Sequence, residues 1–227
     1  MPVLVELFTS EGCSDCPPAD RLLEQLDTKQ SVPGAEAIVL SEHVTYWNHL
    51  GWRDPFSLDE IDQRQKEYGE RFNLDSIYTP QAVIDGEAQV VGNNADGVTN
   101  AIEHAASVPK KPLSVTDTRW ENGAVSFTVH GADAGSRLVA VLAADANGHQ
   151  VSRGENAGRT LHHVAVVRAI KDFGANADGR ALRLSAGSLA KNQTSGPPRL
   201  VVFLVDRKSG RVTAASEQTL APEISAR

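Results

Sequence analysis

The first hydrophobic run of the chain, residues 3–8, is mostly apolar, a pattern typical of a strand that is buried on both faces. A short polar segment follows it, and then Pro17 and Pro18, which a helix tolerates in its first turn because the amide hydrogens there have no partner to lose. Apolar residues then recur at the i, i+3, i+4, i+7 spacing of one helical face: Ala19, Leu22, Leu23 and Leu26. The pattern predicts a strand, a short loop and a helix.

The elements continue to alternate along the first half of the chain. Residues 37–40 are a second strand-like run, and Ser57 with Glu60 three residues later is a capping box that predicts the start of a helix. Two short apolar runs, 81–84 and 88–91, flank the tight-hairpin dipeptide Asp85-Gly86, and residues 96–106 have a helical pattern. This order predicts a mixed sheet covered by helices, an α/β domain over residues 1–110.

The pattern of apolar and polar residues changes after residues 108–112, VPKKP, which have the composition of a linker. Beyond them, short alternating or apolar runs are separated by turn clusters rich in Asn, Asp and Gly. The runs are 126–130, 137–143, 163–170, 200–205 and 212–216. Repeated strand and turn with little helical period predicts an all-β, sandwich-like domain over residues 113–227.

Charge and composition narrow the function classes. The 227 residues carry 22 Lys and Arg against 29 Asp and Glu, a net charge of −7, which argues against a nucleic-acid binder held by a basic surface. No apolar run approaches the length of a transmembrane helix, and no phosphate-cradling glycine loop indicates an organic cofactor. The acidic excess lies in the first 112 residues, which supports two units of different character.

The chemistry-bearing motif is the pair Cys13 and Cys16, on the loop between the first predicted strand and helix. A sulfur near a helix N-terminus is stabilised as a thiolate by the dipole and the free amides. We therefore assign Cys13, with an exposed sulfur, as the nucleophile and Cys16 as the resolving thiol. The neighbouring acidic residues Asp15, Glu11 and Asp20 favour a near-neutral or higher Cys13 pKa and a reductase- or isomerase-like potential.

Two further segments are candidates for the substrate site. Thr79-Pro80 opens the third predicted strand, where a cis proline would present a backbone edge beside the cysteines for a substrate strand to pair with. Residues 43–56 are rich in aromatic side chains. Trp47 and Trp52 of this segment are candidates for the walls of a peptide cleft, with packing against the sheet as the alternative. His43 is a candidate proton acceptor facing the sulfurs.

Several of these motifs together resemble a known family. Residues 6–20, ELFTSEGCSDCPPAD, are similar to the opening signature of the domain-of-unknown-function 1223 family, and residues 43–47, 50–56, 78–81 and 154–161 match its later motifs. That family comprises bacterial, thioredoxin-like, mostly exported proteins. The resemblance implies a thioredoxin-like fold, a redox role and a periplasmic or secreted location. The first residues of this chain have no export-signal pattern, which leaves a cytoplasmic location open.

The sequence thus predicts a thiol–disulfide oxidoreductase that acts on a protein or peptide partner through Cys13 and Cys16, with Pro80 in the catalytic site. Two alternatives stay open. One is a protein that handles copper(I) or zinc, with Cys13, Cys16 and His43 as ligands, because soft thiolates select these ions. The other is a non-catalytic binding module in which the second half recognises the partner.

Overall fold

The computed structural model describes residues 1–185 and 195–221. Three helices lie in these ranges: α1 (Pro17–Lys29), α2 (Asp59–Arg71) and α3 (Ala95–Ala106). The strands of the first half are β1 (Pro2–Thr9), β2 (Glu36–His43), β3 (Gln81–Ile84) and β4 (Ala88–Val91). Those of the second half are β5 (Ser114–Glu121), β6 (Ala124–His130), β7 (Ser136–Gln150), β8 (Thr160–Gly174), β9 (Ala181–Ser185), β10 (Ser195–Asp206) and β11 (Val212–Thr219).

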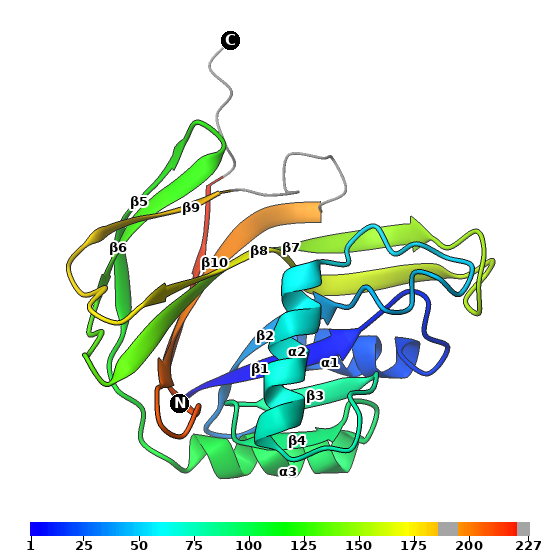
Figure 1. Cartoon of the computed structure of the whole chain (residues 1–227), viewed down its shortest axis with the longest axis horizontal. Helices are drawn as coiled ribbons and strands as arrows, with labels where there is room; N and C mark the ends of the chain where they lie inside the picture. Colours follow the sequence, from blue (N-terminus) through cyan, green and yellow to red (C-terminus); the bar gives the residue numbers. More distant parts are fainter. Residues whose placement is uncertain (186–194, 222–227) are drawn as a thin grey trace.

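One sheet of eight strands runs through both halves of the chain (Figure 1). Its order is β11-β10-β7-β8-β2-β1-β3-β4, and the junction is a parallel pairing of β2 with β8 in which Ser41 lies opposite Val166. A second sheet has the order β5-β6-β9. The expected fold class, a thioredoxin-like α/β domain plus a separate β-sandwich, is therefore wrong. The chain is mostly β, and its main sheet is mixed and shared.

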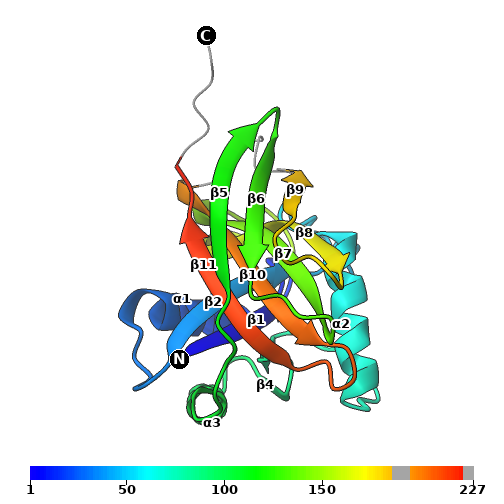
Figure 2. The ribbon, with the colours of Figure 1, turned by 90° about the vertical axis from the view of Figure 1, so that its left-hand side faces the viewer.

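The shared sheet has a physical cause in the apolar runs of β7 and β10. Side chains along β7 alternate between two cores: Val139 and Val141 belong to the core of the first half, whereas Leu138 and Leu142 face the core under the second sheet. Strand β10 alternates in the same way. A strand buried on both faces reads as a continuous apolar run, so these strands are central. Figure 2 shows β5, β6 and β9 beside β7, β10 and β11.

Strand β1 is likewise covered on both faces, as its sequence predicts. Leu7 lies with residues of α1 and α3 on one face. Glu6 and Phe8 point to the opposite face, which α2 covers. Glu6 Oε1 accepts a 2.5 Å hydrogen bond from Arg64 Nε of this helix. Phe8 packs edge-on against Tyr68 of the same helix. The helices thus sandwich this part of the sheet, and the end of β1 delivers the chain to the cysteine loop.

The local predictions are confirmed with one exception. The 81–84 and 88–91 strands form a hairpin, in which Asp85 and Gly86 both have positive φ, 49° and 61°, as a type I′ turn requires. The predicted capping box is wrong. Helix α2 has Leu58 as its N-cap residue, and a leucine side chain cannot cap the helix. Ser57 lies one residue earlier, and its hydroxyl donates to the Asp54 carbonyl oxygen at 2.8 Å.

The segment that joins the two halves, residues 108–112, is fastened to both of them. Lys110 Nζ pairs with the Asp85 carboxylate and donates to the Val212 carbonyl oxygen at 3.0 Å, while Lys111 N donates to the Thr213 carbonyl oxygen at 2.9 Å. No helix in residues 1–185 or 195–221 is long and apolar enough to cross a membrane.

Candidate redox site

Cys13 and Cys16 form a disulfide at the start of α1, with their Cα atoms 5.4 Å apart. Cys16 is the N-cap residue of the helix, and Pro17 and Pro18 occupy its first turn. The loop that leads into the helix is ordered by its own backbone, because Cys13 N donates to the Ser10 carbonyl oxygen at 3.1 Å. The structure therefore has both cysteines at a helix N-terminus, where the sequence pattern predicts them.

Both cysteines are buried, in contrast to the exposed Cys13 sulfur that the sequence analysis expects. The exposed fraction is 1% for Cys13 and 0% for Cys16. An attacking sulfur needs a clear approach to the disulfide, so in this conformation exchange with a partner is blocked. The segments that surround the cysteine loop therefore decide what the site can do.

One covering segment is the loop between β7 and β8. Asn156, itself fully buried, donates from Nδ2 to the carbonyl oxygens of Glu11 and Cys13, both at 2.8 Å. Next to it, Glu155 Oε2 accepts a hydrogen bond from Ser14 N at 3.1 Å. We call residues 151–159 the covering loop. It attaches the second half of the chain directly to the cysteine loop.

The structure brings Trp47 and Thr79, both candidates for the substrate site, together beside the cysteine loop. Trp47 Nε1 donates to Thr79 Oγ1 at 2.8 Å, and a Cβ added at Gly12 would lie 3.1 Å from Trp47 Cβ. The Thr79–Pro80 peptide is cis. Trp47, Thr79 and Pro80 thus form one wall beside the cysteine loop.

Trp52 and His43 make hydrogen bonds with partners other than Thr79. Trp52 Nε1 donates to Glu11 Oε2 at 2.8 Å. The buried His43 ring has Asp54 Oδ2 at 2.7 Å from Nδ1 and Ser41 Oγ at 3.2 Å from Nε2. Both ring nitrogens are thus occupied, and the described residues contain no group of three or more His, Cys, Asp or Glu side chains placed to hold a metal ion.

The buried pair of His43 and Asp54 lies directly behind the cysteine loop, because Asp54 Oδ2 also accepts from Glu11 N at 2.8 Å. Burial by itself would raise the pKa of Asp54, but His43 and the backbone N–H groups of Glu11 and Phe56 outweigh it and lower the pKa to about 2. Asp54 is therefore a carboxylate at neutral pH, and it anchors residue 11 just before the cysteines.

A cluster that local sequence pattern does not predict consists of the buried residues Glu11, Asp20 and His163 and the half-buried His149. Glu11 Oε1 lies 2.7 Å from His149 Nδ1 and 3.4 Å from His163 Nε2, and Asp20 Oδ2 lies 3.7 Å from His163 Nδ1. Burial alone would lower the pKa of His163, but the two carboxylates outweigh it and raise the pKa to about 10. The only sequence signal is His162-His163, where alternation along a strand points one ring inward.

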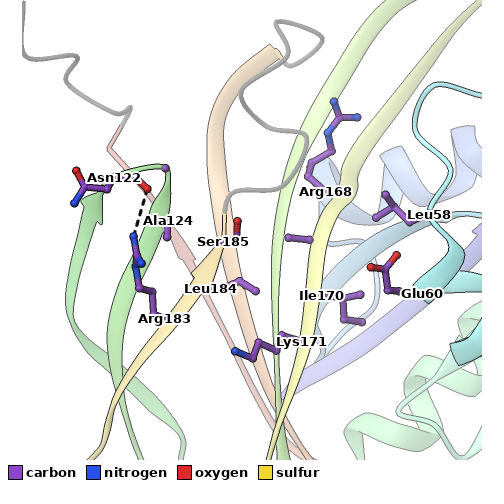
Figure 3. Close-up of a pocket in the computed structure, with 12 residues that line it drawn as sticks. Leu58, Glu60, Asn122, Ala124, Arg168, Ile170, Lys171, Arg183, Leu184 and Ser185 are labelled. Carbon is purple, nitrogen blue, oxygen red and sulfur yellow. Dashed lines mark hydrogen bonds between the residues drawn. The ribbon is translucent and has the colours of Figure 1, made fainter.

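A second concave region lies away from the cysteines, between the edge of β8, the strand β9 and the start of α2 (Figure 3). Its volume is about 680 Å³. The charged side chains that line it are three cations, Arg168, Lys171 and Arg183, and one carboxylate, Glu60. This cleft is a candidate site for an anionic ligand.

Fold and site together define a mixed-sheet protein with a Cys-x-x-Cys disulfide at a helix start, enclosed by a loop from the far half of its own sheet. The family model described as "Protein of unknown function (DUF1223)" matches residues 4–205. The chain therefore belongs to this family.

Solved structures show the same fold. The crystal structure of protein AGR_C_4864 from Agrobacterium tumefaciens is 26% identical, with a TM-score of 0.70 over 98% of this chain and 96% of that chain. HBP35 of Porphyromonas gingivalis is 13% identical, with a TM-score of 0.54 over 96% of this chain and 75% of that one, a likeness of fold alone. Among curated proteins, none matches the chain.

Proposed function

We propose that this protein is a thiol–disulfide oxidoreductase that acts on a protein or peptide disulfide through Cys13 and Cys16. The observation that carries the proposal is the disulfide itself, closed at the first turn of a helix. A bond that closes so small a loop constrains the unfolded chain little, so redox chemistry accounts for it better than stability does. Trp47, Thr79 and Pro80 would contact the partner on the neighbouring wall.

The burial of both sulfurs makes movement of the covering loop part of this proposal. Asn156 and Glu155 join the covering loop to the cysteine loop through three hydrogen bonds, so opening of this loop would break these bonds and leave the pairing of the sheet strands in place. A partner that displaces these two side chains would reach Cys13. We therefore propose a shielded oxidised state and an open, reactive one.

The test is reduction of the folded protein in buffers of known thiol–disulfide potential, followed by alkylation of the free thiols. A redox-active pair is expected to be reduced without unfolding, at a potential above about −300 mV, the upper bound typical of structural disulfides. The Cys16→Ser variant is expected to keep a mixed disulfide at Cys13, and the matched Cys13→Ser variant to keep none. Mass spectrometry of the trapped complex identifies the partner.

The burial of the cysteines also favours a second candidate, a binding module with a structural disulfide. Its ligand site would be the cationic cleft between β8 and β9. In that case the disulfide is reduced only when the protein unfolds, and neither cysteine variant traps a partner. Binding of an anionic ligand would instead depend on Lys171 and Arg183.

A further inference from the structure

The cleft between β8 and β9 is lined by a buried cation whose nitrogens lack partners. Arg168 is only 2% exposed, and within the described residues its Nε and Nη1 atoms have no hydrogen-bond partner. Its Cζ atom lies 5.0 Å from the centre of the Phe56 ring. Burial lowers the pKa of Arg168, and the negative charge of Asp54 only partly opposes this. Because an unpaired buried charge is costly, Arg168 points to a ligand that supplies the missing anion.

Other buried cations of this protein have a carboxylate partner. Arg64 Nε lies 2.5 Å from Glu6 Oε1, and Lys110 pairs with Asp85. The fold can therefore supply a carboxylate to a buried cation, and among the described residues it supplies none to Arg168.

A β-bulge sets the position of Arg168 in β8. Leu142 lies opposite Ala169 and Ala143 lies opposite Val167, so Arg168 between them has no partner residue on β7. Bulges redirect a side chain and are over-represented next to active sites. The irregular pairing at this residue is thus of the kind that serves a site.

Two further cations line the cleft, one on each wall (Figure 3). Lys171 belongs to β8 and Arg183 to β9, and both are exposed. In residues 1–185 and 195–221, neither they nor Arg168 form an ion pair. Glu60 is the one carboxylate in the lining. The cleft therefore carries an excess of positive charge in a chain whose net charge is −7, and it is complementary to a ligand with several anionic groups.

The two strands that flank the cleft both have an open edge there. Strand β8 pairs with β2 only where Val166 lies opposite Ser41, so among the described residues its segment 168–171 has a neighbouring strand on the β7 side alone. Strand β9 pairs with β6 and with no second described strand. An open strand edge offers backbone N–H and C=O groups to an extended peptide. The apolar side chains of the lining include Leu58, Ile170 and Leu184.

We propose that this cleft binds an extended acidic peptide segment of a partner protein, with one carboxylate of the peptide paired to Arg168. The planar guanidinium matches a carboxylate with two parallel hydrogen bonds. The peptide backbone pairs with the open edge of β9, and further carboxylates face Lys171 and Arg183. This inference is independent of the oxidoreductase proposal, and it names the ligand class of the cleft that the second candidate function uses.

The experiment measures peptide binding to the full chain by fluorescence anisotropy. The probe is a rhodamine-labelled decapeptide of alternating Glu and Val, and the control peptide has Gln in place of every Glu. Both are titrated with the wild type, Arg168→Gln, Lys171→Gln and Arg180→Gln. Arg180→Gln is the matched control, because Arg180 is an exposed arginine next to β9 that does not line the cleft.

We expect the wild type to bind the Glu peptide at least about 10-fold more tightly than the Gln peptide, with an affinity that falls as salt is added. Arg168→Gln is expected to weaken binding about 30-fold or more, the effect of removing one partner of a buried charge pair. Lys171→Gln is expected to weaken it about 2- to 5-fold, as for an exposed pair, and Arg180→Gln to bind as the wild type does.

Thermal unfolding without peptide separates a binding role of Arg168 from a structural one. Removal of an unpaired buried cation is expected to leave the melting temperature equal to that of the wild type or higher, whereas a structural arginine would lower it. Should Arg168→Gln not fold, the double variant Lys171→Gln with Arg183→Gln is expected to weaken binding of the Glu peptide about 10-fold, because two exposed pairs are lost.

Three results would overturn the site: no binding of the Glu peptide at millimolar concentration, equal affinity for the Glu and Gln peptides, or wild-type affinity in a folded Arg168→Gln. Binding of succinate by a protein that does not bind the Glu peptide would overturn the peptide assignment in favour of a small dicarboxylate. None of these results bears on Cys13 and Cys16, whose reduction in the folded protein tests the oxidoreductase proposal separately.

Discussion

Replacing Asn156 with alanine should open the disulfide to reduction. The change removes two 2.8 Å hydrogen bonds, to the carbonyl oxygens of Glu11 and Cys13, and both are buried. A hydrogen bond of this kind contributes about 0.5–1.5 kcal/mol net, so the closed position of the covering loop loses about 1–3 kcal/mol. That difference corresponds to about a 5- to 150-fold larger open population. The rate of reduction should rise by the same factor, since attack occurs only in the open state.

The assay is the rate of reduction by dithiothreitol at low denaturant, sampled by acid quenching and alkylation. Ser152→Ala is the matched control, because Ser152 is an exposed residue of the same covering loop and is expected to leave the rate unchanged. The denaturant dependence separates the two routes to the sulfurs: local opening depends on it weakly, global unfolding steeply. A rate for Asn156→Ala that equals the wild-type rate, or that rises only as its global stability falls, refutes the shielding role of the loop.

The remaining predictions concern buried charges. Asp54, with its pKa lowered to about 2, stabilises the fold above its unfolded pKa of 3.8, and this contribution is lost as the pH falls toward 2. Asp54→Asn should therefore lower the free energy of unfolding by about 2 kcal/mol at neutral pH, because the pair with His43 is lost. In urea titrations at pH 2–7, the free energy of unfolding of this variant should fall less steeply with acid than that of the wild type. Arg64→Leu leaves Glu6 and Glu42 without their cation and should cost about 3–5 kcal/mol. Because burial and Glu6 raise the pKa of Glu42 well above its usual value and Arg64 opposes them, the loss should grow as the pH rises through that raised pKa. A loss relative to wild type that is equal at pH 4 and pH 8 contradicts this.

The local elements could be predicted because each has a short-range signal. The Asp85-Gly86 hairpin and the helix behind Pro17 follow from residues that are neighbours in sequence. The junction of the sheet could not, since it depends on Ser41 meeting Val166. The apolar run of residues 138–144 fits a sandwich strand and a central strand equally well, and only the partner on each side decides between them.

The candidate site also combines features that can be predicted from neighbouring residues with features that cannot. Cys13, Cys16, Thr79 and Trp47 belong to motifs in the first half, and the structure brings them together. The position of the covering loop over the disulfide cannot be predicted from local sequence pattern, because Asn156 and Cys13 are 143 residues apart in the sequence. The aromatic segment could be noticed as a cluster, but no sequence signal shows that Trp52 bonds to Glu11 rather than lining a cleft.

The same long-range contacts change the electrostatic argument about the cysteines. From sequence, Glu11 and Asp20 are unpaired negative charges that disfavour a thiolate. In the fold, Glu11 lies against His149 and His163, and Asp20 lies against His163, so an imidazolium from β8 offsets their field within a few ångströms. Asp15 is exposed, where solvent screens it. The reduction potential of the Cys13–Cys16 disulfide therefore depends on residues from β7 and β8 as much as on those beside the sulfurs. For this reason the cover and the charge balance of the disulfide both come from the half of the chain that holds no cysteine.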